Sequence, residues 1–149
     1  MGEDNALFDG VVTEGTERQS HSLQHNGNAP RNQKANPVAR EGCRLIHAWY
    51  TDLFAELIDK MRRIDEGGTS LLDNSMVLYT SYMADGGHGI KDYPTLLVGK
   101  AQGKLKTGLH HAYPLDTPVA NLYAEMLNCL DPSIKGFGDS NGRLPGLRA

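Results

Sequence analysis

Three histidines are the residues of this chain best suited to chemistry. His21 and His25 are four residues apart, and His88 lies in the glycine-rich segment Asp-Gly-Gly-His-Gly at 85–89. Side chains four residues apart share one face of a helical turn. Because neutral imidazole is a common ligand of zinc and related metals, we interpret the three histidines as candidate ligands of a divalent metal such as zinc.

Asp85 precedes His88 in the same glycine-rich segment. Its carboxylate could be a fourth metal ligand, or it could orient a histidine from the second layer of contacts. The alternatives stay open at this point. His21 and His25 could instead cap a turn or be solvated, and His88 could be an ordinary polar residue of a glycine loop.

Composition limits the classes of function. The chain has 149 residues, enough for one domain with a core, and a net charge of -3, which argues against a nucleic-acid-binding face. No apolar run approaches the roughly 20 residues of a membrane span, and the first residues lack the pattern of a signal peptide. Cys43 and Cys129 are interpreted as two buried thiols, with a disulfide as the alternative.

The apolar pattern predicts an irregular polar arm over residues 1–36, which carries His21 and His25, and an α/β domain over residues 37–149. A long helix should begin at Asn36-Pro37 and end near Gly67-Gly68, with an apolar stripe. The stripe contains Ile46, Trp49, Leu53, Leu57, Met61 and Ile64, and Tyr50 and Phe54 widen it; Trp49, Tyr50 and Phe54 are expected in the core.

Two apolar runs, 76–82 and 94–99, predict short strands, and a second helix should run from Thr117-Pro118 to Asp131-Pro132. This order predicts a small mixed or parallel sheet flanked by the two helices. Because two strands are few for a sheet, its exposed edge could pair with a second copy of the chain to give a homo-oligomer.

The run from Ser20 to about Gly142 resembles the carboxy-terminal part of a family of secreted bacterial proteins named for a His-x-x-Ser-His-His motif. The resemblance covers most of this chain but only about the last third of a typical family member. The matching stretches are HSLQHNG (21–27), LLDNSMVL (71–78), MADGGH (83–88), PTLLVG (94–99), GKLKTG (103–108), TPVANL (117–122) and FGD (137–139).

That family is similar to the alkaline-phosphatase and sulfatase superfamily, which has an α/β fold and a metal-bound active site. The resemblance implies that His21 and His25 match a metal-binding pair. It also implies that the strand 76–82 delivers the Asp85 loop to the site, and that His88 matches a late ligand histidine. A metal there would polarise a phosphate or sulfate ester and acidify a water molecule. A secreted or periplasmic location is implied in the same way.

Two departures from the motif favour a different function. Gln24 stands where the motif has Ser, and Asn26 stands where it has its last His. The superfamily's nucleophile and further acidic ligands belong to an amino-terminal half that this chain does not contain. We therefore expect an incomplete metal-dependent ester hydrolase, with a non-catalytic binding or assembly module, or a fragment of a longer protein, as the alternatives.

Overall fold

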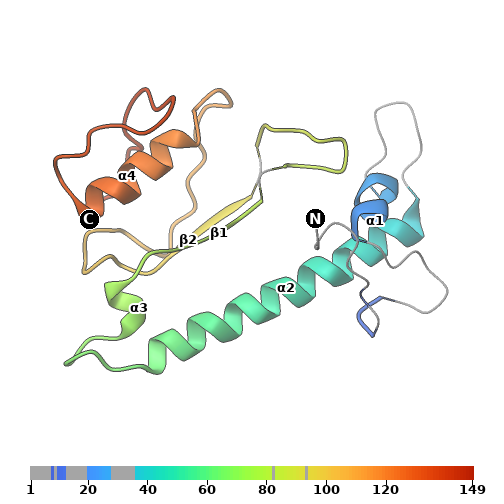
Figure 1. Cartoon of the computed structure of the whole chain (residues 1–149), viewed down its shortest axis with the longest axis horizontal. Helices are drawn as coiled ribbons and strands as arrows, with labels where there is room; N and C mark the ends of the chain where they lie inside the picture. Colours follow the sequence, from blue (N-terminus) through green and yellow to red (C-terminus); the bar gives the residue numbers. More distant parts are fainter. Residues whose placement is uncertain (1–7, 9, 13–19, 28–35, 82, 93) are drawn as a thin grey trace. The chain divides into compact units, whose positions relative to one another are not determined.

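The computed structural model describes residues 8, 10–12, 20–27, 36–81, 83–92 and 94–149. In this part of the chain there are four helices and two strands (Figure 1). In chain order they are α1 (Ser20–Gly27), α2 (Pro37–Arg63), α3 (Leu71–Asn74), β1 (Val77–Thr80), β2 (Thr95–Val98) and α4 (Ala120–Leu130).

The α/β class is confirmed, but the predicted mixed or parallel sheet is wrong because β1 and β2 form a two-stranded antiparallel sheet. A parallel pair needs a crossover connection, usually a helix. In the described part of the segment between the strands there is no helix, so the chain turns back on itself. Residue 82, the end of the predicted first strand, lies outside the described residues.

The chain divides into two compact units. Unit 1 comprises residues 1–57 and 80–94, and unit 2 comprises residues 58–79 and 95–149. This division falls within α2 and at the strand ends, whereas the sequence places a boundary between residues 36 and 37. That boundary stays a prediction.

Within unit 1, α1 packs against the beginning of α2. Leu23 is completely buried and lies in a cluster with Ile46 and Ala39. A Cβ atom on Gly42 would lie 3.0 Å from Leu23 Cδ2, and one on Gly27 would lie 3.0 Å from the backbone of Arg40. The two glycines therefore allow the close approach of these helices. Residues 20–27, which the sequence places in an irregular arm, are helical because this packing supports them.

The start of α2 is capped as predicted. Asn36 Oδ1 accepts hydrogen bonds from the backbone N–H of Val38 at 3.0 Å and of Ala39 at 3.4 Å, which satisfies two of the helix's unpaired donors. The expectation that Trp49 and Tyr50 are core residues is wrong. Their exposed fractions are 39% and 40%, although Phe8 contacts both rings edge-to-face.

Unit 2 has a second apolar cluster that joins α4 to the tail of the chain. It contains Ala101, Leu105, Cys129, Leu144 and Leu147. The tail is also fixed by backbone hydrogen bonds, from Lys106 N–H to the Leu147 oxygen and from Ala149 N–H to the Lys104 oxygen. The residues after Gly136 are therefore an integral part of unit 2.

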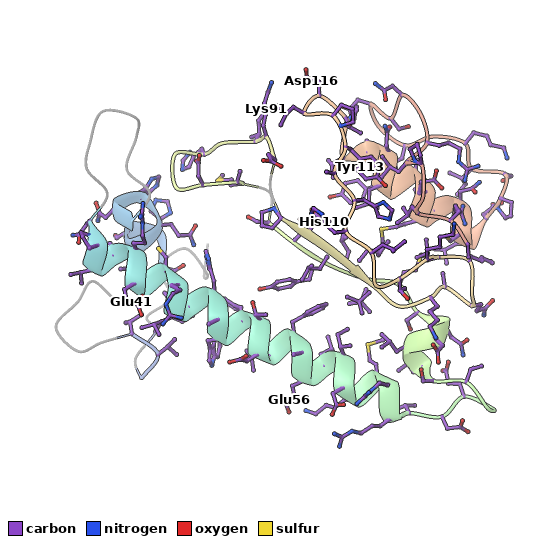
Figure 2. All side chains as sticks on the ribbon, turned by 180° about the vertical axis from the view of Figure 1, so that it is seen from behind. Glu41, Glu56, Lys91, His110, Tyr113 and Asp116 are labelled. Carbon is purple, nitrogen blue, oxygen red and sulfur yellow. The ribbon has the colours of Figure 1, made fainter. Side chains whose placement is uncertain are left out.

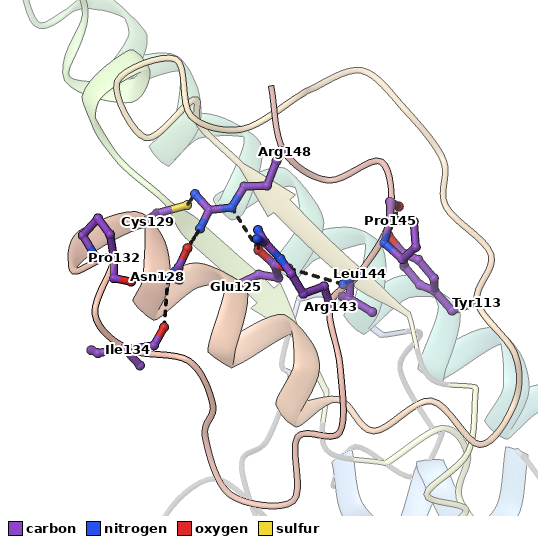
Figure 3. Close-up of polar contacts among 10 residues, drawn as sticks. All are labelled: Tyr113, Glu125, Asn128, Cys129, Pro132, Ile134, Arg143, Leu144, Pro145 and Arg148. Atoms are coloured by element: carbon purple, nitrogen blue, oxygen red, sulfur yellow. Dashed lines mark hydrogen bonds and ion pairs between the residues drawn. The ribbon is translucent and has the colours of Figure 1, made fainter.

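A buried glutamate holds the tail onto α4 (Figure 3). Glu125 is 3% exposed, and its carboxylate accepts hydrogen bonds from Arg143 Nε and Nη2 at 2.7 and 2.9 Å and from Arg148 Nε at 2.9 Å. The Leu144 N–H lies 3.4 Å from the same carboxylate. Arg148 also donates to Cys129 Sγ and to Asn128 Oδ1. Burying a charge is costly unless it is paired in this way.

The turn into β1 is a short helix, α3, with a reciprocal cap. Ser70 Oγ accepts a hydrogen bond from Asp73 N–H, and Asp73 Oδ2 accepts one from Ser70 N–H. Gly99 follows β2 with a φ of +99°, and a Cβ atom there would lie 2.3 Å from the Ser75 oxygen. Only glycine fits this approach between the end of β2 and the turn after α3.

Cys43 and Cys129 are free thiols, Cys129 buried and Cys43 half-buried. Burial raises the pKa of both thiols. Among the described residues, no helix combines the length and the apolar character that crossing a bilayer requires.

Candidate metal centre

The histidine pair lies on one face of α1, as its spacing predicts. His21 Nε2 and His25 Nε2 are 3.1 Å apart, and the two ring centroids are 4.5 Å apart. His21 is exposed and His25 is half-buried, while Leu23, between them in sequence, is buried in the contact with α2. The packing of Leu23 therefore orients the helix so that both imidazoles are accessible.

His88 lies beside this pair. Its ring centroid is 4.9 Å from that of His25, although 62 residues separate the two in sequence. Both histidines belong to unit 1. The structure thus brings together the three histidines that the sequence analysis selects.

The loop of His88 is a tight turn organised by Asp85. Asp85 Oδ1 accepts hydrogen bonds from the N–H of Gly87 at 2.8 Å and of Gly89 at 3.0 Å. Two backbone bonds, from Ala84 N–H to the Gly89 oxygen and from His88 N–H to the Asp85 oxygen, close the turn. His88 has a φ of +62°, a left-handed backbone conformation that costs free energy for residues other than glycine. The turn holds it there.

The Asp85 carboxylate accepts its hydrogen bonds from backbone N–H groups of its own loop. Hydrogen bonds from the N–H groups of Gly89 and Gly87 lower the pKa of the Asp85 carboxyl, and the nearby His88 adds a smaller effect in the same direction. Asp85 was expected either to bind a metal or to orient a histidine. Its hydrogen bonds to the loop that carries His88 match the second role. The role of metal ligand stays a prediction.

The imidazoles are adjacent, but they do not all converge on one point. Among the described residues, no group of three or more His, Cys, Asp or Glu side chains is arranged closely enough to hold a metal ion. His21 and His25 form the close pair, and among the described rings His88 lies beside that of His25. A third bond to a metal would therefore require a rotation of the His88 side chain.

The remaining histidines lie elsewhere. His47 is exposed on α2, and His110 is exposed in the segment before α4 (Figure 2). His111 stacks on Tyr113 with ring centroids 5.8 Å apart. Its buried Nε2 has no hydrogen-bond partner among the described residues. His110 and His111 belong to unit 2, whereas His21, His25 and His88 belong to unit 1.

Sequence reasoning missed the cluster around Glu125. Glu125 lies among the apolar positions of α4, and Arg143 and Arg148 lie in a turn-rich tail without periodicity. The available signal was a charged residue within an otherwise apolar helix, which needs a partner when it is buried.

Comparison with protein-family models, with curated proteins and with solved structures found no match to this chain.

Proposed function

We propose that this chain is the carboxy-terminal portion of a secreted protein with an alkaline-phosphatase-like or sulfatase-like fold. In this proposal His21, His25 and His88 form part of a metal-centred site for a phosphate or sulfate ester. The observation that carries it is the cluster of the three imidazoles, which combines a 3.1 Å Nε2–Nε2 pair with a neighbouring ring from a distant loop.

The spacing of the pair is compatible with one metal ion. Zinc–nitrogen bonds of about 2.0–2.1 Å at tetrahedral angles place two ligand nitrogens about 3.3–3.4 Å apart. The observed 3.1 Å is close to this value, so small side-chain rotations would suffice for both rings to bind. A metal held by two or three imidazoles would leave an open position for water or for substrate.

The roles of the residues follow from their places. His21 and His25 would be the anchoring ligands, because α1 is fixed by Leu23 against α2. His88 would be the ligand delivered by the glycine loop, and Asp85 would keep that loop in its turn. When bound, the metal would polarise the ester oxygen and supply an acidified water molecule.

A non-catalytic binding or assembly module is the second candidate. It is favoured by Gln24 and Asn26, which replace the Ser and His of the motif. Gln24 Nε2 donates to Ser20 Oγ at 3.0 Å, a bond that supports the helix rather than a reaction. Pairing of the chain into a homo-oligomer through a sheet edge would belong to this function.

Metal content of the chain, purified without a histidine tag, is the test of the site. We expect close to one zinc or similar divalent ion per chain after incubation with zinc, and loss of this metal in a His21→Ala/His25→Ala double variant. His88→Ala should weaken binding without abolishing it. His47→Ala, which removes an exposed histidine from α2, is the matched control and should bind as the unaltered chain does.

Two outcomes would contradict the site: no bound metal in the unaltered chain after incubation with zinc, or equal binding by the double variant. Hydrolysis of generic phosphate and sulfate esters then separates the two functions. Turnover that depends on His21 and His25 supports the hydrolase, and metal binding without turnover supports the binding module.

A further inference from the structure

We propose that unit 2 contains a second site, independent of the histidines, that binds the oxyanion group of a small carboxylate or phosphate compound. The site is a hollow of about 360 Å³, within the range of small-molecule pockets. Its walls come from the segment before α4, from the first turn of α4 and from the tail. The lining side chains that matter are Tyr113, Asp116, Thr117, Asn121, Asn141 and Arg143.

The first donor is the side-chain amide of Asn141. Its Oδ1 accepts a hydrogen bond from Asn121 Nδ2 at 3.1 Å, and its backbone N–H donates to Asn121 Oδ1 at 2.8 Å. Asn121 is only 3% exposed, so this double contact is firmly placed. The contact assigns the amide orientation of Asn141, and its Nδ2 donors have no partner among the described residues.

The second donor is the guanidinium of Arg143. Its side chain is 69% exposed, yet Nε and Nη2 are both bonded to the buried carboxylate of Glu125. An exposed arginine side chain is normally mobile, whereas the guanidinium of Arg143 is held by its two parallel hydrogen bonds to the Glu125 carboxylate. Its Nη1 donors are not used in any hydrogen bond within the described residues. They are therefore available to a ligand without further ordering of the side chain.

The positive charge at the hollow comes from the network of Arg143. The single carboxylate of Glu125 is shared by two guanidiniums, those of Arg143 and Arg148, which leaves one positive charge in excess. Asp116 also lines the hollow and brings a negative charge to it, so the anion would have to bind on the side of Arg143. Arg143 is the positively charged side chain among the lining residues.

These features define the chemistry of the ligand. Two fixed N–H donor groups match the oxygens of a carboxylate or a phosphate, which only accept hydrogen bonds. Pro114, Leu144 and Pro145 supply apolar surface at the same hollow, where the organic part of the ligand would lie. The volume suits a small molecule rather than a segment of a macromolecule.

The test is a titration of the ¹⁵N-labelled full chain with benzoate and, separately, with inorganic phosphate at constant ionic strength. We expect saturable shifts of the Asn141 side-chain amide and the Arg143 Nε–H resonance with at least one of the two anions. Saturation with benzoate alone identifies a carboxylate ligand, and saturation with phosphate alone identifies a phosphate ligand.

Asn141→Asp is the decisive variant. It retains the oxygen that accepts from Asn121 Nδ2 and the backbone bond, but it replaces the amide donor with a second acceptor. Binding should be lost while the fold is kept. Gln102→Glu adds the same negative charge at an exposed position outside the hollow and should leave affinity unchanged. Arg143→Lys retains the positive charge but lacks the planar set of guanidinium N–H donors, and it should weaken anion binding about tenfold.

The proposal is overturned if neither anion gives saturable shifts at the hollow. It is also overturned if Asn141→Asp binds as tightly as the unaltered chain. Because backbone amide resonances report folding in the same spectra, a variant that fails to fold is recognised directly, and Arg143→Lys then decides the question.

Discussion

Leu23 of α1 lies directly over Gly42 of α2, so close that a Cβ atom at position 42 would be 3.0 Å from its Cδ2. Together with the packing of Leu23 on Ala39 and Ile46, this contact holds the short helix that carries both histidines of the candidate pair. Because α1 has only eight residues, it would be marginal on its own, and its stability comes from packing against α2.

Gly42→Val should therefore separate α1 from α2. We expect a loss of about 1–3 kcal/mol in the free energy of unfolding, since added methyl groups overpack a buried contact. Zinc affinity should fall as well, because the histidine pair loses its support. Chemical denaturation and a zinc titration measure the two effects.

The matched control is Ala48→Val, an exposed position on the same helix with the same β-branched product. It should cost only the small helix-propensity difference, about 0.5 kcal/mol. Equal losses in the two variants would contradict the role of Gly42.

The Asp85 turn should control the third histidine. In Asp85→Ala the N–H groups of Gly87 and Gly89 lose their acceptor, and His88 loses the frame that holds its positive φ. Zinc affinity of the proposed site should fall about 10–100-fold, as for other residues that orient metal ligands.

Asp85→Asn distinguishes the role of Asp85 in the turn from the role of its charge. The asparagine Oδ1 can still accept both hydrogen bonds, but the negative charge is gone. It should bind zinc nearly as the unaltered chain does if Asp85 acts through the turn. A loss as large as that of the alanine variant would instead indicate that the carboxylate binds the metal itself.

Removal of the Glu125 charge should destabilise unit 2. Glu125→Gln leaves Arg143 and Arg148 without their counter-charge, and we expect a loss of about 3 kcal/mol in the free energy of unfolding. Glu41→Gln, which breaks an exposed pair with Arg44, is the control and should give no measurable change. Comparable effects of the two substitutions would contradict the importance of burial.

The same glutamate predicts a direction of pH dependence. Hydrogen bonds from Arg143, and then from Arg148, lower the pKa of Glu125 in the folded chain. Its contribution to stability is therefore complete above the pKa of the unfolded chain and is lost as the pH falls through the folded pKa. Stability should decline more steeply with acid in the unaltered chain than in Glu125→Gln, as measured by denaturation at several pH values.

Asp73 gives a second acid-sensitive contact. Lys100, and then Ser70, lower the pKa of the Asp73 carboxyl from 3.8 to about 2. Because the folded pKa is the lower one, its stabilising contribution is lost as the pH falls from near 4 to about 2. NMR titration of the carboxyl carbon should show this pKa. Lys100→Met should raise it toward 3.8, whereas Lys135→Met should leave it unchanged.

Helical periodicity in the sequence was sufficient to predict α2 and α4, and the two apolar runs predicted β1 and β2. The sheet's direction was not predictable, because it depends on how the segment between the strands folds. The exposure of Trp49, Leu53 and Leu57 was also not predictable, since periodicity shows which residues share a face but not whether anything covers it.

For the candidate site, residue chemistry and the resemblance selected His21, His25 and His88. The contact between His25 and His88 is long-range and could not come from spacing. α1 was not expected as a regular helix of eight residues because its support comes from tertiary packing, chiefly of Leu23 on α2, and not from its own sequence pattern. The network of Glu125 was missed because its arginines lie in an aperiodic tail.

The division of the chain has a consequence for how it is made. The polypeptide passes between the two units three times, within α2, before the last residue of β1 and just before β2. Unit 1 therefore lacks its His88 loop until residues 80–94 have been synthesised, and at that point more than two thirds of unit 2 is still missing. Neither unit is one continuous stretch of the chain, so each is completed only by contacts between segments distant in sequence, which is the kind of contact that slows folding.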